Sequence, residues 1–176
     1  MRTRAAVAFC FVLVVACGDV AIVDGDSDAS QTPEMMAVAM VRLITVDNTF
    51  GGEPPPSTEY LALDRIDPYA GNTTKPPSEP TRTLTEGERK AIEDAISEYG
   101  PVRWIDDPNP TLDSAPDPDA FQMILGVGEP DIESDTGLVP VSMVCGNVCG
   151  TWFTYRLDRV DDQWVVTGIE GPVSIS

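Results

Sequence analysis

The chain has 176 residues, and its 29 acidic residues outnumber 11 basic ones, which gives a formal net charge of −18. So acidic a protein is a poor partner for nucleic acid, because neutralising phosphates requires clustered Lys and Arg. The chain also has no histidine, which excludes Ser-His-Asp and Cys-His catalysis and histidine metal sites, and we expect neither a metal nor a cofactor.

The first residues have the order of an export signal. Residues 1–4 include two arginines, and residues 5–15 form an apolar run shorter than the roughly 20 residues needed to span a bilayer. The run ends in Val-Val-Ala-Cys at positions 14–17, so that aliphatic and small residues precede a cysteine. This ending resembles the lipobox of bacterial prolipoproteins. The alternative interpretation is an ordinary signal peptide with an incidental cysteine.

The resemblance implies a protein that is exported from the cytoplasm, cleaved before Cys17 and anchored to a bacterial membrane by a diacylglyceryl thioether on that cysteine. Residues 1–16 are then a signal peptide, residues 17–31 an acidic flexible tether, and residues 32–176 a single domain outside the cytoplasm. Because anionic headgroups repel an acidic domain, we expect membrane attachment to depend on the lipid.

A helix is predicted to follow the tether. Thr32 is typical of an N-cap and Pro33 of the first helical position. Met36 and Met40 then begin an apolar pattern at helical spacing, so the helix should be well buried. The glycine pair at residues 51–52 predicts a break after it.

A strand is predicted at residues 60–66, and a second helix follows it. Thr85 and Glu88 have the spacing of a capping box, in which each side chain bonds the backbone N–H of the other residue. The pair Gly100-Pro101 is typical of a helix end. One apolar stripe should hold this helix on a face of the sheet: Ile92, Ala95, Ile96 and Tyr99.

Two short strands are predicted next, at residues 102–105 and 121–127. The segment between them, residues 106–120, contains many prolines and aspartates and predicts an exposed loop.

The last third of the chain predicts an antiparallel meander. Its three runs are residues 139–144, 151–160 and 164–169. In the second run apolar and polar residues alternate with period two, as in a strand with one solvated face. Short connections between the runs favour hairpins, and the polar turn before the third run is Asp161-Asp162-Gln163.

Cys145 and Cys149 flank the first of these connections. Of the four cysteines, Cys10 leaves with the signal peptide and Cys17 carries lipid, so one pair remains in an oxidising compartment. Neighbouring antiparallel strands bring Cβ atoms close enough for a disulfide, which is the predicted state of the pair. A redox dithiol and a metal site are the alternatives.

These elements indicate an α+β domain with five or six mostly antiparallel strands, a C-terminal three-strand meander, and one or two helices packed on the sheet. Their order resembles that of cystatin-like and nuclear-transport-factor-2-like rolls. The resemblance implies a concave sheet, and the aromatic side chains that would line it as a ligand site are Trp104, Phe153, Tyr155 and Trp164.

The expected function is non-catalytic binding of an envelope protein or a small molecule by a lipoprotein domain at a membrane surface. Two alternatives remain open. One is an envelope enzyme or thiol-redox factor that uses Cys145 and Cys149 or a buried pair of carboxylates. The other is a purely structural component of the envelope.

Overall fold

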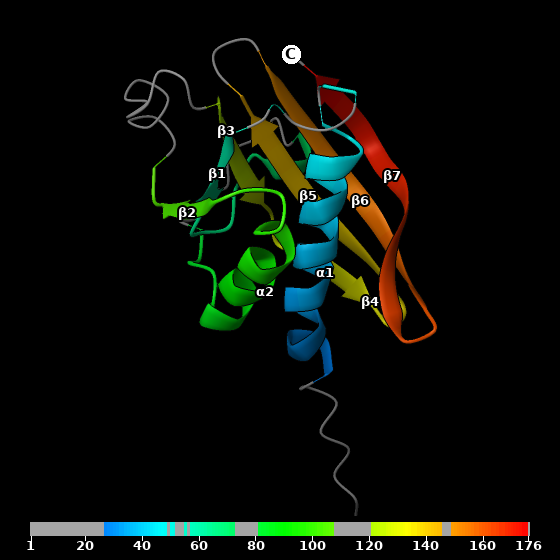
Figure 1. The fold of residues 1–176 in the computed structure, drawn as a ribbon. Helices are drawn as coiled ribbons and strands as arrows, with labels where there is room; N and C mark the ends of the chain where they lie inside the picture. The colour runs from blue at the N-terminus through cyan, green and yellow to red at the C-terminus, as the bar shows by residue number, and fades with distance from the viewer. Residues whose placement is uncertain are drawn as a thin grey trace, which may run out of the picture.

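The helices and strands of the computed structural model build one mixed sheet with both helices on one side (Figure 1). The structure describes residues 27–48, 50–51, 55, 57–72, 81–107, 121–145 and 149–175. In these ranges the elements are α1 (Ser27–Thr45), β1 (Thr58–Leu63), the 3-10 turn η1 (Ala70–Asn72), α2 (Glu86–Ile96), β2 (Val102–Ile105), β3 (Phe121–Val127), β4 (Asp131–Glu133), β5 (Thr136–Val144), β6 (Gly150–Val160) and β7 (Gln163–Ile175).

The strand order in the sheet is β2-β1-β3-β5-β6-β7, and the short β4 pairs with β5. The predicted α+β class is confirmed, as is the adjacency of the three C-terminal strands. Seven strands are present in the described residues rather than five or six. The sheet is also mixed, because β1 pairs in parallel with both β2 and β3. Parallel neighbours need a crossover connection, and the segment that carries α2 supplies the one between β1 and β2.

Helix α1 crosses the middle of the sheet, in front of β5 and β6, and α2 lies beside it (Figure 1). The predicted capping box begins α2: Thr85 accepts from the Glu88 backbone N–H at 3.2 Å, and Glu88 accepts from the Thr85 N–H at 2.7 Å. The helix ends at Ile96, earlier than predicted, and Tyr99 is exposed rather than part of its apolar stripe. Helix α2 packs mainly against α1.

The main core lies between the helices and this face of the sheet. Its strand residues alternate along each strand, as the period of two requires. The completely buried side chains of α1 recur at helical spacing, so they form one face of the helix, and this face packs into the core. They are Met35, Met36, Ala39, Met40, Leu43 and Ile44.

Helix α1 begins at Ser27, five residues before the predicted N-cap, and Pro33 lies inside it. Proline removes one backbone hydrogen bond from a helix, but Arg159 of β6 donates from Nη1 to the Gln31 side-chain oxygen at 3.2 Å and holds the first turns on the sheet. The last five residues of the predicted tether are therefore helical. The signal peptide, Cys17 and the rest of the tether lie outside the described residues.

The opposite face of the sheet carries a smaller apolar cluster of Leu61, Leu63, Ile105 and Ile124. The turn η1 packs across β5 and β6 on this face, where Gly71 has a φ of 70° and a Cβ would meet Pro140 and Thr154. Most of the predicted loop at residues 106–120 lies outside the described residues. Among the residues described, no helix combines the length and apolar character needed to cross a membrane.

Candidate functional site

The C-terminal end of α1 is closed by its own side chains and by a tight turn. Thr45 donates from Oγ1 to the Val41 carbonyl at 2.7 Å. The backbone N–H groups of Val46 and Asp47 both donate to the Arg42 carbonyl, at 3.0 and 3.3 Å. This turn brings the Asp47 side chain beside that of Arg42, at the end of the helix.

Asp47 connects the helix to the sheet. Its Oδ2 atom accepts from Arg42 Nε at 2.6 Å and from the Tyr155 hydroxyl of β6 at 3.0 Å. Both bonds fall on the same oxygen. Within the described residues, no hydrogen bond reaches Asp47 Oδ1 or the two terminal amino groups of Arg42.

The side chain of Tyr155 is fully buried in the core, and its hydroxyl donates to Asp47 at the end of α1. Burial raises the pKa of its hydroxyl, and the charge of Asp47 and the hydrogen bond to it raise this pKa further, while Arg42 acts in the opposite direction. The hydroxyl therefore stays neutral at physiological pH and remains a donor that fixes the Asp47 carboxylate.

A β-bulge in the last hairpin gives the site its apolar wall. Between Arg156 and Leu157 the pairing of β6 with β7 shifts by one residue, so that Ile169 lies opposite Tyr155 and on the same face. The bulge interrupts the alternation of faces along β7: Val165 pairs with Asp158 and lies on the other face, although four residues separate it from Ile169.

A cleft of about 370 Å³ opens between the end of α1 and β7. Its volume lies within the range typical of small-molecule sites. It combines one cation, one carboxylate, two hydroxyls and an apolar wall, and its lining residues are Arg42, Asp47, Tyr155, Val166, Thr167, Gly168 and Ile169.

The four aromatic residues proposed from the sequence do not form one site. Phe153 and Tyr155 stack with ring centroids 5.7 Å apart, but α1 covers this face and both rings belong to the core. Trp164 is also buried in the core, and it pairs with Arg159 near the turn of the hairpin, away from Tyr155. Of these three, Tyr155 lines the cleft.

Trp104 lies on β2, at the other edge of the sheet from β7. Its indole Nε1 donates to Glu93 of α2 at 3.0 Å. It lines a separate cleft of about 420 Å³ whose Lys90 and Asp94 side chains are bonded to each other at 2.7 Å. Four of its six lining side chains are therefore engaged in pairs, and the other two are those of Glu86 and Arg89.

Sequence reasoning missed Arg42 and Asp47. The only local signal is that Asp47 follows a buried helix and sits in the turn that ends it. Its partner Tyr155 is 108 positions away in the chain, so no short-range pattern connects the two.

Cys145 and Cys149 are joined as a disulfide across the β5–β6 connection, with Cα atoms 5.0 Å apart. The Cys145 N–H also donates to the Cys149 carbonyl at 2.8 Å, which continues the strand pairing to the cysteines. The bond closes the end of the hairpin, several residues from the cleft at Tyr155. Within the described ranges, no three acidic or cysteine side chains gather as metal ligands.

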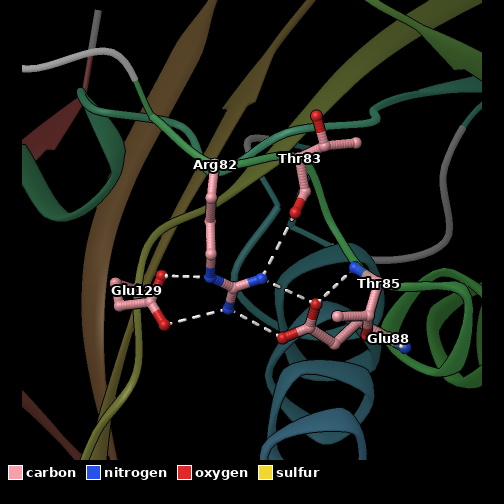
Figure 2. Close-up of polar contacts among 5 residues, drawn as sticks. All are labelled: Arg82, Thr83, Thr85, Glu88 and Glu129. Carbon is pink, nitrogen blue, oxygen red and sulfur yellow. Dashed lines mark hydrogen bonds and ion pairs between the residues drawn. The ribbon is translucent and has the colours of Figure 1, made fainter.

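A second charged cluster fastens the start of α2 and is internally satisfied (Figure 2). Arg82 donates to both oxygens of Glu88 at 2.8 Å and to both oxygens of Glu129 at 2.8 and 2.9 Å. Its fifth N–H interaction is with the Thr83 carbonyl at 3.4 Å. Since the guanidinium uses its donors within the protein, this cluster is best explained as structural.

Comparison of the chain with protein-family models, with curated proteins and with solved structures finds no match in any of the three. The site must therefore be interpreted from its own chemistry.

Proposed function

We propose that this chain is an exported lipoprotein whose α+β domain binds a small ligand at a membrane surface, without chemistry on it. The observation that supports binding is the cleft beside Tyr155, where an apolar wall meets hydrogen-bonding groups of Arg42 and Asp47 that have no partner within the described residues. A concave site with a few convergent polar groups is the usual form of a ligand site.

The anchoring part of the proposal rests on the sequence before Ser27. The apolar run and the lipobox-like ending at Cys17 support export and acylation. The Cys145–Cys149 disulfide supports an oxidising compartment, where such bonds persist.

The position of the cleft suits a protein anchored before α1. The first turns of α1 contact Arg159 near the β6–β7 turn, whereas Arg42 and Asp47 lie at its other end. A helix of 19 residues is about 28 Å long. The cleft would then open on the part of the domain that is farther from the membrane, where a ligand has free access.

The anchor is tested by intact mass measurement of the protein from its native membrane, with thiols alkylated before and after reduction. We expect a chain that begins at a diacylated Cys17, with Cys145 and Cys149 blocked until reduced. An unlipidated chain, or no loss of membrane attachment in Cys17→Ala, would contradict anchoring. Free thiols at both other positions would favour the thiol-redox alternative.

Ligand binding is tested by thermal unfolding of the purified domain against a library of small metabolites. A true ligand should raise the melting temperature of the wild type but not that of Arg42→Gln. Arg103→Gln is the matched control, because Arg103 also pairs through Nε with a carboxylate, Glu59, at 3.0 Å and is similarly exposed. A library without any ligand that depends on Arg42 would contradict the proposed binding function.

A further inference from the structure

The unused hydrogen-bonding groups of the cleft have opposite charges. Arg42 is bonded to Asp47 through Nε, and its two terminal amino groups have no partner among the described residues. The two terminal amino groups form a planar donor fork, which can bind both oxygens of a carboxylate. Asp47 has both of its bonds on Oδ2, which leaves Oδ1 as an acceptor for an ammonium group.

The surroundings favour the ammonium as well as the carboxylate. The cleft lies at the C-terminal end of α1, where the helix dipole attracts positive charge. The whole chain carries 29 acidic residues against 11 basic ones, which disfavours a ligand that is purely anionic. A molecule with both charges matches the site better than either ion alone.

The apolar wall adds a third requirement. Ile169 is 42% exposed although it faces the helix side of the sheet, and Val166 lies beside it in the lining. An aliphatic side chain on the ligand would cover this surface, at a gain of about 25 cal/mol for each Å² of apolar area removed from water.

The Arg103–Glu59 pair of the sheet is also joined through Nε, but it differs from Arg42–Asp47 in how many of its carboxylate oxygens are bonded. Glu59 accepts from Arg103 on Oε1 and from Gln122 on Oε2, at 3.0 and 2.7 Å, so both of its oxygens are engaged. The pair at the end of α1 is joined through Nε at 2.6 Å, but one carboxylate oxygen and the two terminal amino groups are left unbonded among the described residues, and both side chains line the cleft.

We infer that the cleft binds a free α-amino acid with an aliphatic side chain. The ligand carboxylate meets the terminal amino groups of Arg42, its ammonium meets Asp47 Oδ1, and its side chain lies against Val166 and Ile169. Tyr155 is a positioning residue, since it holds Asp47 through Oδ2. The inference rests on the proposed binding function and names the ligand class of the same site.

The test is titration calorimetry of the disulfide-bonded domain with L-leucine. We expect saturable binding with a Kd below about 1 mM, and binding at least about 10-fold weaker for N-acetyl-leucine, leucinamide and glycine, which each lack one of the three features. Arg42→Gln and Asp47→Asn should each weaken L-leucine binding by at least about 10-fold, and Arg103→Gln should leave it unchanged.

Folding of each variant is checked by urea unfolding. Arg42→Lys serves where Arg42→Gln is unstable, because lysine keeps the charge beside Asp47 but lacks the fork, and it too should weaken binding. Equal affinity for leucine and its capped derivatives, or no saturable binding of L-leucine, would overturn the inference. If another metabolite then stabilises the wild type but not Arg42→Gln, the ligand class is wrong while the proposed binding function stands.

Discussion

Glu88 is a carboxylate that is almost fully buried and yet ionised. Burial opposes its charge, but the hydrogen bonds from Arg82 and from the Thr85 backbone outweigh burial and hold the pKa of Glu88 below its ordinary value of 4.5. Because the folded pKa is the lower one, ionised Glu88 stabilises the protein fully above about pH 4.5. That stability is lost as the pH falls through the folded pKa.

Replacing this side chain should therefore have an effect that depends on pH. We expect Glu88→Gln to lower the free energy of unfolding at pH 7 by about 1.5–3 kcal/mol, since it weakens charge-assisted bonds to Arg82 in a buried site. At pH 3 the difference from the wild type should shrink. Urea unfolding at the two pH values measures both.

Glu129 provides the control for this prediction. It bonds the same guanidinium, but its side chain is 58% exposed, so Glu129→Gln should cost less than about 1 kcal/mol at pH 7. A loss for Glu88→Gln that is equal at both pH values would mean that Glu88 acts through packing rather than charge.

Two strand glycines differ in the space around them. A Cβ on Gly126 would collide with Asp67 and Ser142, whose side chains are hydrogen-bonded to each other on the far face of the sheet. A Cβ on Gly168 would meet nothing within 4 Å. We expect Gly126→Ala to destabilise the domain by about 1–3 kcal/mol and Gly168→Ala to change its stability by less than about 0.5 kcal/mol, as measured by urea unfolding. Equal effects would contradict this close packing.

At the scale of elements, local patterns predicted those parts of the fold that depend on neighbours in the chain. The Thr85–Glu88 capping box marks the start of α2, and β2 and β3 have the predicted bounds. The turn of the last hairpin is also where the sequence predicts it, with φ of 50° at Asp161 and 62° at Asp162. Caps, turns and periodicity act over a few residues, which explains these successes.

The parts that sequence reasoning missed depend on distant contacts. Parallel pairing of β1 with β2 and β3 joins segments whose order no local pattern encodes. The bulge beside Leu157 breaks the period of two, so the direction of Ile169 was not predictable from alternation. The cleft combines both effects, because Asp47 reaches Tyr155 across the domain.

The disulfide closes a short loop, so its expected contribution is moderate. For a loop of about five residues the chain-entropy model gives about 2 kcal/mol. We expect the Cys145→Ser and Cys149→Ser double variant to lose about this free energy of unfolding, measured with urea in the absence of reductant. The cleft lies several residues along the hairpin from this bond, so ligand binding by the folded variant should be unchanged. Lost binding in a folded variant would mean that the two sites are coupled.

At the scale of the whole molecule, charge and the direction of α1 determine how an anchored domain would stand on a membrane. The chain is strongly acidic, and the β6–β7 turn near the start of α1 carries Asp161 and Asp162. Anionic headgroups should repel this end. In the proposed anchored form, the ten residues from Cys17 to Asp26 span at most roughly 35 Å and would keep the domain near the bilayer without requiring it to lie on the surface.

This arrangement predicts that the two ends of α1 differ in their distance from the lipid. A fluorophore attached at position 162, beside the start of α1, should be quenched by energy transfer to an acceptor dye on the lipid headgroups more strongly than one at position 50, beyond its end. The difference arises because α1 separates the two ends by about 28 Å. The measurement uses the lipidated protein in vesicles that contain phosphatidylglycerol.

The control is the same pair of labels on a chain that begins at Gly18 and lacks the lipid. Neither label should be quenched in that chain, because the acidic domain has no attraction of its own for anionic vesicles. Quenching of the lipid-free chain would mean that the domain itself binds the membrane. Equal quenching of the two labels in the lipidated protein would mean that α1 lies parallel to the surface, and the cleft would then open beside the headgroups rather than away from them.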